Sequence, residues 1–270
     1  MLRFRVLTAA IGLPLVIVSA LLGHGFFCLF LGVVTAACTI ELCRLVPGLP
    51  KRDALALVAI AWAVLLATRS LFVHADVGAA LISIPLVITL LLLLTRREAR
   101  RTFTEWAWTV GSAFYAGWLL GHWGLLYAMA DGLALVLFGM LTTFAYDTGA
   151  YFSGRAFGRH KMAPRISAGK TWEGGIGGLL IGMGVAIATR AAAIGITGEF
   201  TFSLGATILA GILVPVAAQL GDLVESALKR SAGVKDAGNL LPGHGGMLDR
   251  FDSLLFTGTM LYFYTLWIAF

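Results

Sequence analysis

Long runs of apolar residues, separated by short polar segments, dominate the chain from end to end. A helix that crosses a bilayer needs roughly 20 mostly apolar residues, and nine stretches of about that length can be placed. They lie at about residues 6–22, 26–43, 54–73, 77–95, 105–128, 133–153, 173–194, 203–228 and 253–270. The pattern predicts an all-α fold: a polytopic integral membrane protein with about nine transmembrane helices.

Composition agrees with this class. Hydrophobic residues make up 59% of the chain and charged residues 13%, whereas an ordinary globular domain carries about 25% charged residues. Because no linker rich in Pro or Ser and no long extramembrane segment interrupts the apolar runs, we expect one membrane domain over residues 1–270. The net charge of +6 is explained by membrane topology and anionic headgroups, so nucleic acid is not an expected partner.

The positions of the basic residues predict the topology. If the amino terminus is cytoplasmic, all of the 20 Lys and Arg residues except Arg69 and Arg190 fall in cytoplasmic segments, as the positive-inside rule expects. The start of the chain resembles a signal sequence, but we interpret it as the first span because no cleavage site is followed by a soluble domain. Cys28, Cys38 and Cys43 fit no metal or redox spacing and are expected to be small core hydrophobes.

Acidic residues divide the chain unevenly. Up to about residue 140 the spans are nearly free of acids, with Glu41 as the main exception. The second half carries several in or near its spans: Asp147, Glu173, Asp222 and Glu225. Because ionisable groups in membrane segments are costly and usually functional, we expect residues 1–140 to be mainly scaffold and residues 141–270 to hold the catalytic spans and loops.

A basic, glycine-containing segment joins the sixth and seventh spans. Ser167, Lys170 and Thr171 immediately precede a glycine-rich helix start, and helix amino termini with nearby Lys or Arg bind phosphate well. The spacing is not that of a P-loop, and a cytoplasmic basic loop is the simpler interpretation. The repeat Gly174, Gly178, Gly182 favours close helix packing.

The end of the eighth span carries the densest polar pattern. Four side chains recur at helical spacing and would share one face: Asp222, Glu225, Ser226 and Lys229. Asp249 and Asp252 occupy i and i+3 just before the ninth span. If Ser231–Gly246 folds back through its Pro and Gly residues, the two acidic pairs meet at the cytoplasmic boundary. Such oxygen ligands suit Mg²⁺; structural ion pairing is the alternative.

Bases interleave with these acids, which indicates chemistry on a phosphorylated substrate. Magnesium would bridge phosphate oxygens while Lys and Arg neutralise charge on the leaving group. A phosphate monoester acceptor has a second pKa of about 6 and needs no general base. His244 is therefore left open between a base, a phosphate ligand and a packing residue.

Two segments together resemble the phosphatidate cytidylyltransferase (CDP-diacylglycerol synthase) family. The first runs from Ser226 to Asp252 and holds Lys229-Arg230, Lys235-Asp236, Pro242, His244-Gly245-Gly246 and Asp249-Arg250-Phe251-Asp252. The second, from Asp147 to Gly175, holds Asp147-Thr148-Gly149-Ala150-Tyr151-Phe152, Gly154-Arg155, Ser167, Lys170-Thr171 and Glu173-Gly174. Ala237 departs from the family pattern, in which Ser is common after Lys-Asp.

The resemblance implies Mg²⁺-dependent transfer of CMP from CTP to phosphatidic acid at the cytoplasmic face of the cytoplasmic (inner) membrane, with a homodimer as one assembly and the number of metal ions open. The candidate catalytic residues are Asp222, Asp249, Lys229 and Arg250. The candidate substrate-binding residues are Ser226, Arg230, Lys235, His244, Lys170, Ser167 and Asp147. The candidate metal ligands are Asp222, Asp249, Asp252 and Glu225. Membrane lipids are the expected surroundings.

Other functions fit the sequence less well. A CTP-dependent kinase of lipid alcohols would need a general base, and the long match at Ser226–Asp252 argues against it. The alcohol phosphotransferases that consume CDP-diacylglycerol carry an Asp-Gly-x2-Ala-Arg motif that is absent here. A secondary transporter would show paired repeats and a site near the midplane, whereas the acids here cluster at one face.

Overall fold

The computed structural model describes residues 14–45, 54–72, 75–94, 99–238, 240 and 245–268. Within these ranges the chain is almost entirely helical, and the only sheet is a two-stranded hairpin. The all-α prediction is confirmed apart from that hairpin. Contacts divide the chain into two compact units, one of Met1–Leu125 with Ala232–Arg250 and the other of Leu126–Ser231 with Phe251–Phe270.

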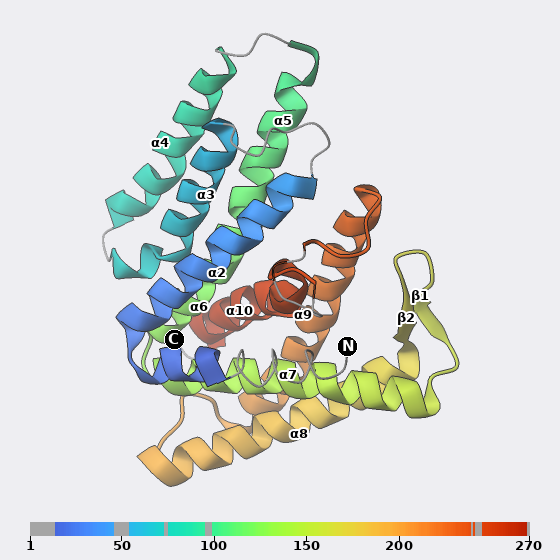
Figure 1. Ribbon diagram of the computed structural model, residues 1–270. Helices are drawn as coiled ribbons and strands as arrows, with labels where there is room; N and C mark the ends of the chain where they lie inside the picture. Colours follow the sequence, from blue (N-terminus) through green and yellow to red (C-terminus); the bar gives the residue numbers. More distant parts are fainter. Residues whose placement is uncertain are drawn as a thin grey trace. The chain divides into compact units, whose positions relative to one another are not determined.

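The first unit is built from helices that follow one another along the chain (Figure 1). They are α2 (His24–Leu45), α3 (Ala54–Ala67), the short 3-10 turn η1 (Arg69–Leu71), α4 (Ala75–Leu93), α5 (Ala99–Ser112), the π-helical segment η2 (Ala113–Trp118) and α6 (Leu119–Tyr127). Apolar side chains of α3 and η2 form a buried core, in which Trp62 and Phe114 pack edge to face with ring centroids 5.2 Å apart. Apolar burial therefore holds this unit together.

The second unit contains the longest helices. They are α7 (Gly132–Phe157), α8 (Trp172–Thr197), α9 (Leu204–Ser231) and, from Phe251 onward, most of α10 (Leu248–Ile268). The hairpin strands β1 (Lys161–Ala163) and β2 (Ser167–Thr171) connect α7 to α8 and pair antiparallel, with Lys161 opposite Thr171. A cluster of aromatic rings packs this unit, since Phe202 contacts both Phe138 and Tyr264 edge to face.

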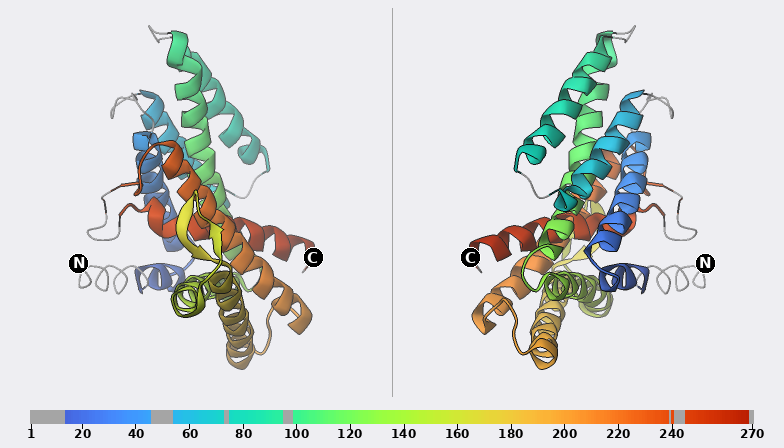
Figure 2. Two further views of the ribbon diagram at one scale, coloured as in Figure 1. Left: turned by 90° about the vertical axis from the view of Figure 1, so that its right-hand side faces the viewer. Right: turned by 90° about the vertical axis from the view of Figure 1, so that its left-hand side faces the viewer.

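Helices α7 and α8 lie side by side along much of their length (Figures 1 and 2). A Cβ at Gly178 would come 2.7 Å from the carbonyl oxygen of Tyr146, and one at Gly174 would come 2.8 Å from that of Ala150. Only glycine allows the two backbones to approach this closely. The prediction that the glycine repeat of α8 serves helix packing is confirmed.

Within the described residues, the apolar runs of the sequence correspond to helices. Four of them, α2, α7, α8 and α9, are long and apolar enough to cross a membrane by length and composition. Helix α3 and residues Gly78–Leu93 form shorter apolar helices. The count of nine spans and the cytoplasmic amino terminus stay predictions, and much of the first predicted span lies outside the described residues.

Two segments have more regular secondary structure than the sequence indicated. The segment expected to be a basic loop contains the β1–β2 hairpin, which ends where the side chain of Thr171 accepts a hydrogen bond from Gly174 N and caps α8. Asp249 and Asp252 were expected just before the last span; α10 begins at Leu248 and includes both, so they lie in the first turns of the helix that carries this predicted span. Carboxylates are stabilising at a helix amino terminus, so the polar pattern there belongs to the helix itself.

Candidate active site

One face of α9 carries the predicted polar side chains in the second unit. Ser226 donates to Asp222, with Oγ 3.3 Å from Oδ1, and Lys229 Nζ lies 2.5 Å from Oε2 of Glu225. The shared helical face is thus confirmed. The helix continues to Ser231, so Asp222 lies more than two turns from its end rather than near it. Glu225 is fully buried, which makes its pairing with Lys229 important.

The hairpin adds a second lysine to this face. Lys170, on β2, places Nζ 2.7 Å from Oδ2 of Asp222, and both side chains are partly buried. Arg230, near the end of α9, donates from Nε to the carbonyl oxygen of Ile166 at 3.3 Å. Ser167 begins β2, where it is paired with Ala163. Strand β2 and α9 therefore form one polar surface, which carries residues of both the hairpin and the helix.

Asp252, in the second turn of α10, is surrounded by other carboxylates of the same unit. Asp252 precedes the predicted last span. Burial raises the pKa of its carboxyl group well above the usual range, and the charges of Asp222, Glu225 and Asp147 raise it further. Ser253 links α10 to α7, because its Oγ donates to Oδ1 of Asp147 at 3.4 Å. Asp147, predicted from sequence as a substrate-binding residue, is thus brought to the same acidic cluster.

The side chains of this cluster are of the kind that bind a cation, but they are not arranged as a complete set of metal ligands. Within the described ranges, no group of three or more His, Cys, Asp or Glu side chains is arranged to hold a metal ion. Oxygen atoms of Asp147, Asp222 and Asp252 are nevertheless the donors that Mg²⁺ prefers. Because like charges in one place raise the pKa of a carboxyl group, a cation among them would relieve their repulsion.

Sequence reasoning missed one interaction next to this cluster. The hydroxyl of Tyr146 on α7 donates to Oε1 of Gln219 on α9. Each residue lies within one helical turn of a candidate acid, Asp147 or Asp222. A glutamine inside an apolar helix was the available signal, since polar groups within membrane segments usually have a structural or functional partner.

Asp249 belongs to the first unit and organises the segment that precedes α10. Its Oδ2 accepts hydrogen bonds from the backbone N–H groups of Ala237, at 3.0 Å, and Gly246, at 2.7 Å. Gly245 has a φ of +81°, a conformation that other residues rarely adopt. The tight return predicted for this loop stays a prediction, because Pro242 lies outside the described residues; at position 237 it is the backbone N–H of the alanine that binds Asp249.

The remaining candidates of this loop have different positions. Lys235 and Arg250 are exposed. His244 lies outside the described residues, so its role stays open. The meeting of Asp249 with Asp222 stays a prediction.

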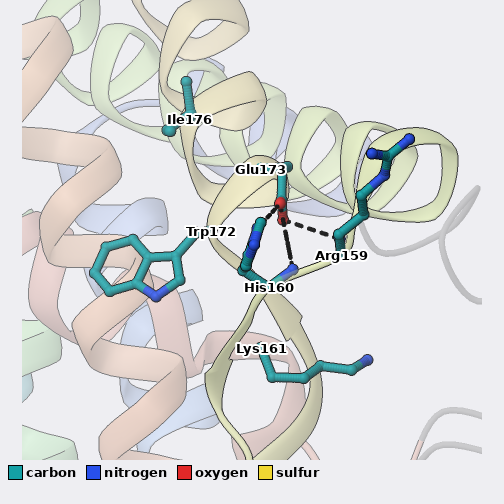
Figure 3. A pocket seen from close by; sticks show the side chains of 6 residues that line it. All are labelled: Arg159, His160, Lys161, Trp172, Glu173 and Ile176. Carbon is teal, nitrogen blue, oxygen red and sulfur yellow. Dashed lines mark hydrogen bonds and ion pairs between the residues drawn. The ribbon is translucent and has the colours of Figure 1, made fainter.

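A separate open pocket lies at the base of the hairpin in the second unit (Figure 3). It is lined by Arg159, His160, Lys161, Trp172, Glu173 and Ile176. The carboxylate of Glu173 accepts from the backbone N–H groups of Arg159 and His160 and lies 2.6 Å from Nδ1 of the same histidine. Glu173, noted in the sequence only as an acid near a span, thus fixes the entry to the hairpin.

The sequence of this chain is similar to those of known proteins. A model of the family described as the cytidylyltransferase family matches residues 3–268 of the chain. The phosphatidate cytidylyltransferase of Bacillus subtilis (strain 168) is 39% identical over 206 residues, which cover 75% of this chain and 74% of that protein.

Two staphylococcal proteins with the same name are also similar. The one from Staphylococcus saprophyticus is 41% identical over 162 residues and the one from Staphylococcus aureus (strain COL) 40% identical over 164. In both cases this chain spans about 60% of the length of the relative, and the alignment also covers about 60% of this chain.

Proposed function

Because the chain belongs to the cytidylyltransferase family, we propose that it transfers CMP from CTP to phosphatidic acid, giving CDP-diacylglycerol and pyrophosphate. The names of its relatives support this choice of substrates. The observation that carries the proposal is the cluster of Asp222, Lys170 and Lys229 on and beside an otherwise apolar helix, with Asp252 and Asp147 of the same unit close enough to influence one another.

The chemistry requires charge neutralisation more than proton transfer. An oxygen of the lipid phosphate attacks the α-phosphorus of CTP, and the bond from that phosphorus to the oxygen bridging to the β-phosphorus breaks. Pyrophosphate leaves with the electron pair. Since a phosphate monoester is already ionised near neutral pH, with a second pKa of about 6, no side chain has to remove a proton. Lys170, Lys229 and Arg230 would bind the phosphates and stabilise charge on the leaving group.

Mg²⁺ is the expected cofactor of this site. When bound, it would neutralise phosphate oxygens of the nucleotide. Asp222 and Asp252 would hold it, together with Asp249 as the sequence predicts, and Asp147 is a further oxygen donor beside Asp252. Glu225, also a predicted ligand, is buried against Lys229, so we assign it to holding that lysine in place.

The same proposal includes the finer details of topology and assembly. We place the protein in the cytoplasmic membrane with about nine spans, a cytoplasmic amino terminus and the active site at the cytoplasmic face, because the Lys and Arg distribution favours this orientation. A homodimer is the assembly implied by the family resemblance. Labelling of single cysteines introduced at Arg165 and Glu199, from either side of sealed vesicles, would test the orientation.

The decisive experiment follows the label of the nucleotide. Purified protein in detergent is incubated with phosphatidic acid, Mg²⁺ and CTP labelled on the α-phosphate, and the lipid phase is analysed. We expect label in CDP-diacylglycerol, whereas CTP labelled on the γ-phosphate should release labelled pyrophosphate and leave the lipid unlabelled. Lipid labelled from the γ-phosphate, with diacylglycerol as acceptor, would instead show a kinase. No lipid label from either nucleotide would refute nucleotide chemistry on lipids.

A further inference from the structure

Glu41, on α2, is a buried carboxylate far along the chain from the residues it contacts. Its side chain is only 2% exposed. It accepts hydrogen bonds from the backbone N–H groups of Met247, at 2.9 Å, and Leu248, at 2.8 Å. All three residues belong to the first unit. The sequence showed Glu41 only as an exception among spans nearly free of acids.

These two donors explain why a charged group is tolerated in this position. Leu248 is the first residue of α10, and the first N–H groups of a helix have no partner within the helix. A carboxylate there satisfies two such groups and interacts favourably with the helix dipole. A buried carboxylate needs hydrogen bonds of this kind, so Glu41 and the start of α10 depend on each other.

The loop before α10 is shaped around the same carboxylate. A Cβ at Gly238 would lie 2.7 Å from Oε1 of Glu41, and a Cβ at Gly246 would overlap Oε2. Gly246 is also one of the two residues whose backbone N–H groups bind Asp249. The other, Ala237, directly precedes Gly238. Glu41 therefore contacts the loop at the positions that set the orientation of Asp249.

We propose that Glu41 is a positioning residue for CMP transfer: from α2 it fixes the turn at Gly246–Leu248 and so holds the Asp249 carboxylate in its working orientation. This inference rests on the proposed function, in which Asp249 contributes to Mg²⁺ binding. Glu41 itself does not touch the reacting atoms. Replacing a residue that orients a metal ligand typically lowers metal affinity or activity by about 10- to 100-fold. We assign Glu41 to this kind of residue, although it is far from Asp249 in the sequence.

The test compares Glu41→Gln with Thr39→Val in the full-length protein. Glutamine keeps the size of the side chain but turns an amide NH₂ toward one of the two N–H donors, so the fold is retained while one hydrogen bond is lost. Thr39 is buried two residues away on α2, and its hydroxyl donates only within the helix, to the carbonyl of Thr35. Thr39→Val is therefore a matched buried substitution outside the Asp249 loop.

Three quantities are measured: hydrogen exchange of the peptide spanning 245–250, the Mg²⁺ concentration that gives the half-maximal rate, and kcat. For Glu41→Gln we expect faster exchange in this peptide and a half-activating Mg²⁺ concentration raised on the order of 10-fold, with a comparable fall in kcat. Thr39→Val should match the wild type in all three. A loss of folded molecules alone would lower the rate but could not move the Mg²⁺ midpoint.

The outcomes separate the two proposals. Unchanged exchange in Glu41→Gln, or faster exchange with a wild-type Mg²⁺ midpoint and kcat, would overturn the positioning role while leaving the proposed function intact. If the wild-type protein forms no CDP-diacylglycerol, the proposed function fails and the catalytic role of Glu41 fails with it. The exchange measurement does not depend on activity and reports the Glu41 contacts in either case.

Discussion

Lys170 on β2 and Asp222 on α9 form a partly buried ion pair, with Nζ 2.7 Å from Oδ2. This pair ties the hairpin between α7 and α8 to the helix that carries Ser226 and Lys229. It joins one segment that resembles the cytidylyltransferase family, Asp147–Gly175, to the helix on which the other such segment begins, at Ser226. The phosphate-binding role suggested by the basic segment and the metal-binding role suggested by α9 therefore concern one surface of the second unit.

Lys170→Met should lower kcat/KM for CTP by about 10- to 100-fold, because a positive charge that would contact phosphate is lost and the hairpin is released from Asp222. Steady-state kinetics with varied CTP would measure it. Arg165→Met is the matched control, since Arg165 is an exposed cation of the same hairpin region. Equal losses in both variants would mean that the overall charge of the hairpin, rather than the Lys170–Asp222 pair, matters.

Asp249→Asn should abolish CMP transfer and leave the protein folded. The asparagine oxygen can still accept from the N–H groups of Ala237 and Gly246, whereas the negative charge required for a metal ligand is removed. Labelled-CTP incorporation and the melting temperature in detergent would be measured together. Glu199→Gln, which removes one charge from the exposed connection between α8 and α9, should leave both unchanged. Normal turnover in Asp249→Asn would remove this residue from the metal site.

Lys229→Ala should both weaken nucleotide use and destabilise the fold. The sequence analysis named Lys229 as a candidate catalytic residue, and the structure adds that Lys229 neutralises Glu225, which is fully buried. Removing one partner of a buried pair typically costs about 3–5 kcal/mol. The double variant Glu225→Gln/Lys229→Met should recover much of the melting temperature and none of the lost activity. A single variant as stable as the wild type would show that the pair contributes little.

The raised pKa of Asp252 predicts a pH-dependent stability. A carboxyl group that binds its proton more tightly in the folded state makes the folded protein lose stability as the pH rises above the usual value of 3.8 toward the raised folded-state pKa. In Mg²⁺-free buffer with EDTA, the melting temperature of the wild type should therefore fall from about pH 5 to about pH 8 more than that of Asp252→Asn. Parallel curves for the two proteins would contradict the crowding of carboxylates around Asp252.

Gly178→Ala should destabilise the protein, because its Cβ would meet Tyr146 and Ala150 of α7 at 2.7 and 2.8 Å. Overpacking of this kind typically costs about 1–3 kcal/mol. Gly184→Ala lies on the same helix with nothing within 4 Å of its Cβ and should be neutral or stabilising by up to about 1 kcal/mol, the usual difference in helix propensity. Thermal unfolding in detergent compares the two; a similar effect of both would refute the close α7–α8 contact.

The arrangement of helices was largely predictable because it follows from local periodicity. Apolar runs of the right length form helices in a membrane, because a helix gives every backbone N–H and C=O group a hydrogen-bond partner. The spacing of Asp222, Glu225, Ser226 and Lys229 places them on one side of α9 regardless of the rest of the protein. The glycine repeat of α8 likewise indicated close packing before its partner was known. The β1–β2 hairpin was missed, because three- and five-residue strands are too short to show an alternating pattern.

By itself, the sequence determined which helices form and which of their faces are polar, since both depend on residues close together in the chain. Only the tertiary structure decided that Lys170 pairs with Asp222, that Lys229 serves a buried Glu225, and that Glu41 binds the first N–H groups of α10. Such contacts join residues that are far apart in sequence, and whether a carboxylate meets a lysine, a backbone amide or another carboxylate depends on packing that no local pattern records.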